Sequence, residues 1–348
     1  MNSGEMNLGE LNKVATAMVA PGRGILAVDE STGTLTMRFD AIGVESTPDS
    51  RRDYREMLFR SVDGMGKYIS GVILFDETIR QKAKDGAPLV ELIEKTGALP
   101  GIKVDKGTKP LPFCPGEVIT EGLDGLRERL IEYRGLGAKF AKWRAVIDID
   151  QEHGLPSHTC VMANAQTLAR YAALCQEQNI VPIVEPEVLM DGDHTIDRCV
   201  EVTTWVLKET FQLLFYNRVA LQGMVLKPNM AVPGKKSPTQ VSVEEVAKKT
   251  VSMLKDCVPT AVPGIAFLSG GQSDEEATAH LDAINKIGDL PWRVTFSYGR
   301  ALQAAPQMAW AGKSENLPAA QRAFTHRAMM NSLAARGQWK QALEKKAA

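Results

Sequence analysis

The chain has 348 residues, of which 44% are hydrophobic and 24% are charged. These values are typical of a globular protein with a substantial core, and the length fits one large α/β barrel or two ordinary domains. Lysine and arginine total 41 against 42 acidic residues, so the chain lacks the basic excess of proteins that bind nucleic acid or an anionic membrane. Any anionic ligand must therefore be bound by a local basic cluster.

The N-terminus and the cysteines indicate a cytoplasmic protein. The first 22 residues lack the basic start and apolar core of a signal peptide, and no apolar window is long enough to cross a membrane. The five cysteines are odd in number, widely spaced and never in a CxxC motif. We expect reduced thiols, most of them small core residues: Cys114, Cys160, Cys175, Cys199 and Cys257.

Short apolar or β-branched segments recur along the chain, separated by segments with helical periodicity, such as residues 163–179 and 243–257. Strands are predicted at residues 24–30, 68–77, 101–107, 140–148, 180–188, 223–230, 264–271 and 292–299. Eight strands, each followed by room for a helix, predict an α/β fold of the (β/α)₈ TIM-barrel type. An open doubly wound sheet of six strands would leave two of them without a place.

No low-complexity linker divides the chain, so a single barrel domain is expected over residues 1–348. A first helix at about residues 8–19 is expected to cover one end of the barrel. The segment at roughly residues 313–348 is expected to form a C-terminal helical tail that frays into a basic, alanine-rich end.

Charged residues occur inside the predicted strands. In a barrel, residues i and i+2 of a strand point the same way, and functional groups gather at the C-terminal ends of strands. The pattern places Asp29 and Glu30 on the first strand, Lys103 and Asp105 on the third, Lys142 and Arg144 on the fourth, Glu185 and Glu187 on the fifth, and Lys227 on the sixth. Burying so many charges is costly unless they pair or are used. We expect them to share one barrel mouth, although any single one could be a solvated edge residue or a structural ion pair.

Three of these residues, Lys103, Lys142 and Lys227, are candidates for a nucleophilic amine. Crowding by other cations and partial burial both favour the neutral amine, which can attack a ketone and form a Schiff base. Charge crowding does not choose among the three, although Lys227 has the most apolar neighbours. Glu185 and Glu187 could supply the acid and base of that chemistry, one with a raised pKa and one ionised. Alternatively, they only neutralise cations of the mouth.

The loops after the seventh and eighth strands, LSGGQS at residues 268–273 and SYGRALQ at residues 297–303, combine glycines, hydroxyls and a basic side chain. Barrels often bind phosphate in these two loops. Ser31, Thr34 and Arg38 follow the first strand and could bind a second anion, or the hydroxyls could cap a helix.

Neither a metal site nor a nucleotide cofactor is predicted. The five histidines are scattered, without the HxH, HExxH or HxxH spacings of metal ligands, so surface or satisfied core positions are expected for them. The chain also lacks GxGxxG and Walker motifs.

Seven motifs, taken together and in this order, resemble the class I fructose-1,6-bisphosphate aldolases: GILAVDESTGT, GIKVDKG, AKWRAV, IVEPE, LKPNM, FLSGGQS and FSYGRALQ. The match runs from about residue 10 to about residue 330. The resemblance implies a metal-free Schiff-base lyase of glycolysis and gluconeogenesis, on a (β/α)₈ barrel and assembled as a homotetramer. It further implies reversible cleavage of fructose 1,6-bisphosphate to dihydroxyacetone phosphate and glyceraldehyde 3-phosphate.

Carried over motif by motif, the resemblance makes Lys227 of LKPNM the Schiff-base nucleophile and Glu185 of IVEPE the principal acid and base. Glu187 is similar to a residue that assists near the imine. Asp29 matches the carboxylate linked to C–C cleavage, and Lys142 the lysine that stabilises developing charge.

The resemblance also assigns substrate contacts. A C1-phosphate site is implied at Ser269, Gly270, Gly271, Ser297, Gly299 and Arg300. A C6-phosphate region is implied at Ser31, Thr34, Arg38 and Lys103, with Arg144 in the substrate channel.

Two positions depart from the family pattern. Thr34 stands where serine is common, which keeps the hydroxyl, and the chain ends WKQALEKKAA without the terminal tyrosine typical of the animal enzymes. The preference between fructose bisphosphate and fructose 1-phosphate therefore stays open. The alternatives are a Schiff-base aldolase of other preference, such as sedoheptulose bisphosphate, a transaldolase-like enzyme, or a non-catalytic sugar-phosphate-binding scaffold.

Overall fold

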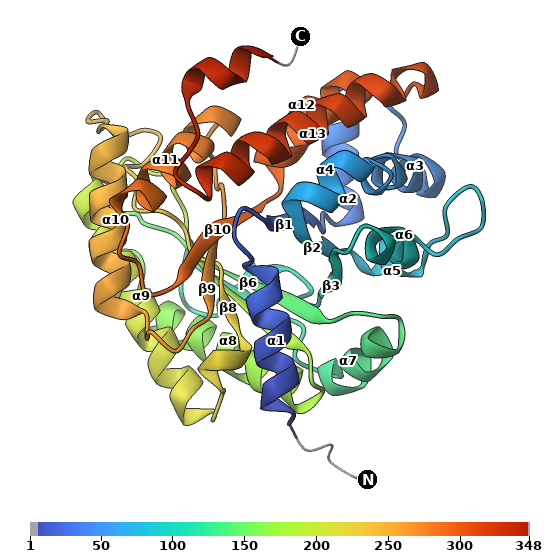
Figure 1. The fold of residues 1–348 in the computed structure, drawn as a ribbon. Coiled ribbons are helices and arrows are strands. Elements are labelled where there is room, and N and C mark those ends of the chain that lie inside the picture. The colour runs from blue at the N-terminus through green and yellow to red at the C-terminus, as the bar shows by residue number, and fades with distance from the viewer. Residues whose placement is uncertain (1–5, 347–348) are drawn as a thin grey trace.

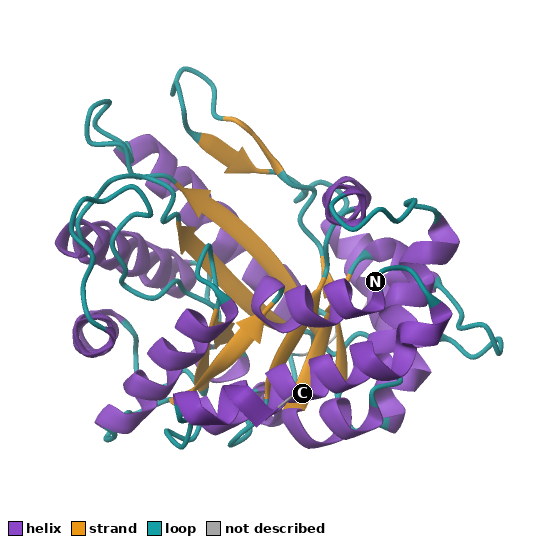
Figure 2. Ribbon diagram, turned by 90° about the horizontal axis from the view of Figure 1, so that it is seen from above, coloured by secondary structure: helices purple, strands orange, loops and turns teal. Residues whose placement is uncertain are grey.

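A computed structural model describes residues 6–346. Eight parallel strands form a closed barrel in the order β1-β10-β9-β8-β7-β6-β3-β2, surrounded by helices (Figures 1 and 2). The barrel strands are β1 (Gly24–Val28), β2 (Ile69–Leu74), β3 (Leu99–Lys103), β6 (Phe140–Ile147), β7 (Val181–Val188), β8 (Val225–Leu226), β9 (Gly264–Phe267) and β10 (Arg293–Tyr298). The predicted (β/α)₈ class is confirmed, because each predicted strand corresponds to one of these eight.

The strands are shorter than predicted, mainly at their C-terminal ends. The sixth predicted strand, residues 223–230, is reduced to the two residues of β8. Every residue of β1, β2 and β7 is buried, as expected for parallel strands that are covered on both faces. The residues that follow the shortened strands form loops at the C-terminal end of the barrel.

The helices follow the alternation expected of the fold, and several begin at a serine or threonine cap, such as Ser157, Thr195 and Ser242. The α-helices are α1 (Leu8–Met18), α2 (Thr32–Asp40), α3 (Pro48–Phe59), α4 (Val62–Tyr68), α5 (Asp76–Arg80), α6 (Leu89–Lys95), α7 (Leu126–Gly135), α8 (His158–Glu177), α9 (Ile196–Tyr216), α10 (Val243–Cys257), α11 (Asp274–Ile287), α12 (Arg300–Trp310) and α13 (Leu317–Ala334). Three 3₁₀ turns complete the set: η1 (Leu221–Gly223), η2 (Ser314–Asn316) and η3 (Gln341–Lys346).

Helix α1 covers the N-terminal end of the barrel, where it lies in front of the strands in Figure 1. Its apolar residues Leu11, Ala15 and Met18 form one cluster with inward-facing strand residues. The following Val19 packs so close to Gly264 that a β-carbon there would lie 2.6 Å from a Val19 methyl group. The expectation of a covering helix is thus confirmed, and the opposite end of the barrel is left open.

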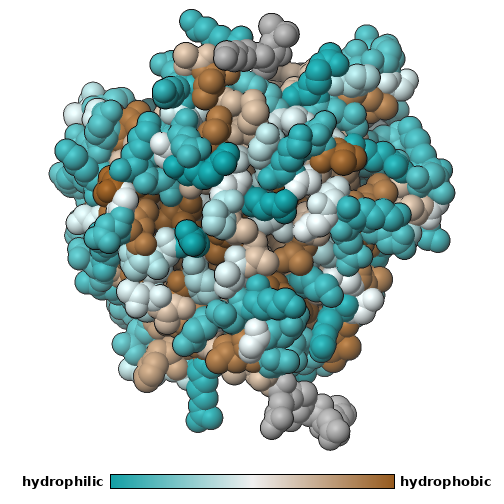
Figure 3. Space-filling model, in the orientation of Figure 1, coloured by the Kyte–Doolittle hydropathy of each residue, from teal (hydrophilic) through white to brown (hydrophobic). Residues whose placement is uncertain are grey.

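A hairpin of β4 (Thr108–Pro110) and β5 (Val118–Thr120) was not predicted. It forms the separate two-stranded sheet that protrudes from the barrel in Figure 2, and Phe113 in its connecting loop is fully exposed. On the face that Figure 3 shows, hydrophilic side chains predominate and apolar side chains form separate patches. No helix within residues 6–346 has the length and apolar character needed to cross a membrane.

The tail contains α13 and η3, and the basic, alanine-rich end for which fraying is predicted extends beyond residue 346. After α13 the chain turns back, and Trp339 donates its backbone N–H to Asp282 on α11 at 2.8 Å. Glu344 in η3 forms an ion pair with the buried Arg327 of α13 and accepts a hydrogen bond from the Trp339 indole. Residues 347 and 348 lie outside the described part.

Candidate active site

A cavity of about 420 Å³ opens at the C-terminal end of the barrel. Every barrel strand except β2 contributes to its lining, either directly or through the loop that follows. All predicted site residues line this cavity except Gly271. The Gly271 amide instead faces the Met190 sulfur at 3.3 Å, and an added β-carbon would lie 2.0 Å from Lys235 side-chain atoms.

Four of the predicted catalytic residues form a continuous buried ionic chain. The Lys142 ammonium lies 2.8 Å from an Asp29 carboxylate oxygen and 3.1 Å from Glu185. The other oxygen of Glu185 lies 3.1 Å from the Lys227 ammonium. Lys227 itself is only 4% exposed. Glu185 therefore links the two lysines, and Lys142 links the two carboxylates.

These close contacts determine the ionisation of the chain. Burial alone would raise the pKa of Asp29, but the nearby Lys142 and Lys227 ammoniums lower it to about 2. Burial opposes ionisation of Glu185 in the same way, and Lys142 and Lys227 again lower its pKa below the usual value. Of the two roles predicted for the glutamates, Glu185 therefore fits that of the ionised group. Both groups are carboxylates at neutral pH in the absence of a ligand.

Lys142 behaves differently from what cation crowding predicted. Burial would lower the pKa of its ammonium, but Asp29 and Glu185 outweigh burial and raise the pKa above the ordinary lysine value. The prediction counted the neighbouring cations without the carboxylates that contact them. Lys142 therefore remains an ammonium, rather than the reactive amine that crowding alone would favour.

Backbone pairing holds Lys227 although it lies beyond β8. Its N–H donates to the Val184 carbonyl on β7 at 2.8 Å, which continues the strand ladder by one residue. On the other side, the Pro228 carbonyl accepts the Leu268 N–H at 3.1 Å. The lysine is thus fixed between two neighbours, and its side chain projects into the cavity with that of Glu185.

The predicted i, i+2 pairs on β3, β6 and β7 also meet in this cavity. Lys103 forms an ion pair with Asp105 at 3.1 Å. Arg144 forms an ion pair with Glu187 on the adjacent strand. Glu185 and Glu187 do form ion pairs with cations of the mouth, as the alternative interpretation predicted. These ion pairs are compatible with a catalytic role.

The loops after β9 and β10 form one side of the mouth. Gly270 has a φ of 56°, in the left-handed region that glycine adopts without strain. The buried Ser297 hydroxyl has no hydrogen-bond partner within residues 6–346. Gly299 caps α12, and the exposed Arg300 is its first residue. A helix N-terminus with a hydroxyl, a glycine turn and a guanidinium is suited to an anion.

Helix α2 lies beside these loops at the mouth, because β1, which precedes it, is the barrel neighbour of β10. The Ser31 hydroxyl accepts the Thr34 N–H and so caps the helix, which confirms the capping alternative. Both residues also line the cavity, so a cap and a ligand contact are compatible. Arg38 forms an ion pair with Glu30, and Gln303 of α12 donates to the same carboxylate at 2.7 Å.

Some lining residues had not been assigned to the site from the sequence. Glu30 and Asp105 were recognised as charged residues at strand ends, and this position could have assigned them to the site. Gly107 and Thr108 belong to the start of the hairpin. No sequence signal indicated that this hairpin would turn toward the mouth.

Comparison with known proteins identifies the family. The family model for class-I fructose-bisphosphate aldolase matches residues 10–348. The chain belongs to this family. It is 54% identical over 336 residues to the "Probable fructose-bisphosphate aldolase class 1" of Xanthomonas campestris pv. campestris, covering 96% of this chain and 100% of that protein. It is 51% identical over 331 residues to "Fructose-bisphosphate aldolase C" of Rattus norvegicus, covering 95% of this chain and 91% of that one.

A solved structure supports the same conclusion about the fold. The fructose-bisphosphate aldolase of Plasmodium falciparum, crystallised with TRAP and a small-molecule inhibitor, superimposes with a TM-score of 0.94 at 48% identity and 96% coverage of both chains. The family resemblance of the seven motifs is confirmed, and with it a lyase that acts on a phosphorylated sugar.

Class I aldolases are metal-independent. Within residues 6–346, no three His, Cys, Asp or Glu side chains are grouped to hold a metal ion.

Proposed function

We propose that this class I aldolase cleaves fructose 1,6-bisphosphate reversibly into dihydroxyacetone phosphate and glyceraldehyde 3-phosphate through a Schiff base on Lys227. The observation that carries the proposal is the buried chain Lys227–Glu185–Lys142–Asp29, which lies in the same cavity as two separate groups of candidate anion ligands. A site that only bound sugar phosphates would need those ligands but not the ionic chain between them.

The surroundings of the three candidate amines favour Lys227. Lys142 is held as an ammonium by two carboxylates that raise its pKa. Lys103 is paired with Asp105 beside the hairpin. Lys227 contacts one carboxylate, which it shares with Lys142. Lys227 is therefore the buried lysine of the chain with a single carboxylate partner, and Glu185 lies 3.1 Å away to take its proton and return it.

Glu185 carries the proton transfers of imine formation in this proposal. Its carboxylate takes a proton from the Lys227 ammonium, and the neutral amine attacks the C2 ketone. The carbinolamine hydroxyl then leaves as water after it receives a proton from the Glu185 carboxyl. Glu187, two residues along the same face of β7, assists near the imine.

The protonated imine then acts as the electron sink for C–C cleavage. A base of the Asp29 and Glu185 pair takes the C4 hydroxyl proton, the C3–C4 bond breaks, and its electron pair forms the enamine. Lys142 stabilises negative charge that develops on the C4 oxygen. Protonation of the enamine at C3 and hydrolysis of the imine release dihydroxyacetone phosphate and the free amine.

Two phosphate sites orient the substrate across this chain. We assign the C1 phosphate to the loops after β9 and β10, namely Ser269, Gly270, Ser297, Gly299 and Arg300, and leave out Gly271 because its amide faces Met190. We assign the C6 phosphate to Ser31, Thr34, Arg38 and Lys103, with Arg144 along the channel between them. Binding at both ends holds the C2 ketone near the amine, which lowers the barrier through positioning.

The test is a coupled cleavage assay with fructose 1,6-bisphosphate, sedoheptulose bisphosphate and fructose 1-phosphate at matched concentrations. Two cationic phosphate sites predict a higher kcat/KM for the two bisphosphates than for fructose 1-phosphate, and the proposed function predicts the highest value for fructose 1,6-bisphosphate. A higher kcat/KM for either of the other sugars would identify that sugar as the preferred substrate. Binding of all three without cleavage would establish the scaffold alternative.

We also propose a cytoplasmic homotetramer that serves glycolysis or gluconeogenesis. The five free thiols, four of them buried, are compatible with a reducing compartment. Phe215 and Tyr216 at the end of α9, together with Phe113 of the hairpin, are large exposed apolar side chains that contact between copies would bury. Sedimentation velocity at micromolar concentration should give the mass of four chains, and a monomeric mass would contradict the assembly.

A further inference from the structure

Arg55 of α3 is a buried guanidinium outside the lining of the active-site cavity. Its side chain is 1% exposed, and its Nη2 donates to the backbone carbonyl of Glu30 at 2.9 Å. Within residues 6–346, its Nε and Nη1 have no hydrogen-bond partner. A buried cation that makes a single full hydrogen bond is unfavourable for stability alone. Its place in the fold therefore requires an explanation beyond packing.

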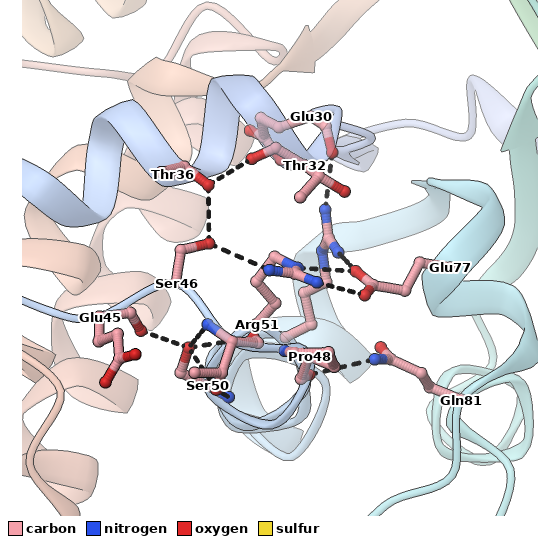
Figure 4. A network of polar contacts seen from close by, with 12 residues as sticks. Glu30, Thr32, Thr36, Glu45, Ser46, Pro48, Ser50, Arg51, Glu77 and Gln81 are labelled. Atoms are coloured by element: carbon pink, nitrogen blue, oxygen red, sulfur yellow. Dashed lines mark hydrogen bonds and ion pairs between the residues drawn. The ribbon is translucent and has the colours of Figure 1, made fainter.

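An acidic residue behind Arg55 fixes its position. Glu77, at the start of α5, accepts two hydrogen bonds from Arg51, at 2.9 Å and 2.6 Å. Its carboxylate also lies 3.7 Å from Nη1 of Arg55. Figure 4 shows Arg51 and Glu77 facing one another below Glu30. Arg51 and Arg55 are one turn apart on α3, so Glu77 contacts both guanidiniums, and that of Arg55 reaches the corner between β1 and α2 that carries Glu30.

The corner at Glu30, between β1 and α2, connects the catalytic carboxylate Asp29 to the proposed C6-phosphate site. Asp29, which precedes Glu30, contacts Lys142 in the ionic chain. Ser31, which follows it, begins the helix that carries the proposed C6-phosphate ligands. A displacement of the Glu30 carbonyl would therefore move both the catalytic carboxylate and the distal phosphate site.

Helix α3 holds the same corner through a second route. Tyr54, adjacent to Arg55, donates to Gln303 at 3.0 Å. Gln303 in turn donates to the Glu30 carboxylate and to the Ala27 carbonyl, each at 2.7 Å. The corner is thus bound through its backbone by Arg55 and through its side chain by Gln303. The contact through Arg55 involves neither Lys227 nor the loops after β9 and β10, whereas the contact through Gln303 comes from α12, the helix that Arg300 begins.

We propose that Arg55, held by Glu77, is a positioning residue that sets the β1–α2 corner and thereby aligns Asp29 and the C6-phosphate site for cleavage of the bisphosphate. The inference rests on the proposed function. The inference predicts different effects on two reactions of the same site. Imine formation with dihydroxyacetone phosphate uses Lys227, Glu185 and the C1-phosphate loops, and is independent of Arg55. Cleavage of the bisphosphate also uses the corner, and depends on it.

The test compares two rates in the same variants: cleavage of fructose 1,6-bisphosphate, and borohydride trapping with dihydroxyacetone phosphate. We expect Arg55→Met to lower kcat/KM for cleavage by about tenfold to a hundredfold, while the trapping rate stays within about twofold. Arg55→Lys keeps the charge and one donor, so it should recover part of the cleavage rate. Arg52→Met is the matched control, because Arg52 is on the same helix but, among residues 6–346, pairs only with Asp49 and Asp53. It should change neither rate.

Equal losses in trapping and cleavage, or no loss in either, would overturn the inference. If Arg55→Met does not fold, Glu77→Gln provides the same comparison, because it keeps the side-chain shape and weakens the support of Arg55. A selective loss of cleavage is expected there too, and an equal loss would again overturn the inference. Failure of the unmodified chain to cleave the bisphosphate or to be trapped would instead contradict the proposed function.

Discussion

Replacing Lys142 with methionine tests the ionic chain most severely. Lys142 is the buried cation that contacts both Asp29, at 2.8 Å, and Glu185, at 3.1 Å. Methionine has a similar length and no charge. The variant therefore keeps most of the packing, but it leaves Asp29 without an ion-pair partner and Glu185 with Lys227 alone.

The size of the effect follows from the pKa of Asp29. The difference between the ordinary value of 3.8 and about 2 corresponds to roughly 2 to 3 kcal/mol of stabilisation at neutral pH. Removing one partner of a buried ion pair generally costs about 3 to 5 kcal/mol, because the other charge remains buried. We therefore expect Lys142→Met to lower the free energy of unfolding by about 3 to 5 kcal/mol at pH 7.

The pH dependence distinguishes this cause from lost packing. In the unmodified chain the pKa of Asp29 is depressed, so its contribution is complete above the unfolded value near 4 and disappears as the pH falls toward 2. In Lys142→Met, burial should raise the pKa of Asp29 above its unfolded value. Folding then takes up a proton, and the variant gains relative stability as the pH falls from 7 to 5.

The assay is denaturant unfolding followed by circular dichroism at pH 5, 6 and 7, at one fixed protein concentration. Adding Asp29→Asn to Lys142→Met is the matched control, because it removes the unpaired carboxylate. The double variant should recover part of the loss at pH 7 and lose the pH dependence. A deficit that is the same at pH 5 and pH 7, or one below about 1 kcal/mol, would refute the reasoning.

Three further outcomes are expected. Arg300→Ala should raise KM for phosphorylated sugars at least about tenfold, because it removes the cation of the C1-phosphate site, and an unchanged KM would remove Arg300 from that site. EDTA should leave activity unchanged in this class I enzyme, and marked loss on chelation would point to a class II type mechanism. Glu344→Gln should lower the thermal midpoint by a few degrees in calorimetry, because Arg327 loses its buried counter-ion, without changing KM. A raised KM there would mean that the tail also acts on the mouth.

The positions of the strands could be predicted because each is a short apolar run with both faces covered. The grouping of charged residues at one mouth followed from the i, i+2 rule and from the geometry of a barrel. Their ionisation could not be predicted in the same way. The pKa of Lys142 depends on two carboxylates that are distant in the sequence, and only the fold brings them within 3.1 Å.

Other features could not be predicted from the sequence because they also depend on contacts between distant residues. The tail from residue 335 is held by Glu344 and Trp339 against α11 and α13, and neither contact has a short-range sequence signal. Gly271 directly follows Leu268, Ser269 and Gly270, which line the cavity, yet its amide turns toward Met190. The role inferred for Arg55 depends on its packing against a strand end 25 residues earlier in the chain.

The central claim is that Lys227 is the Schiff-base nucleophile. The most direct measurement is borohydride reduction in the presence of dihydroxyacetone phosphate, followed by proteolysis and mass spectrometry of the labelled peptide. We predict one adduct per chain, on the peptide that contains Lys227. An adduct on Lys103 or Lys142, or the absence of any adduct in an enzyme that cleaves the sugar, would contradict that claim.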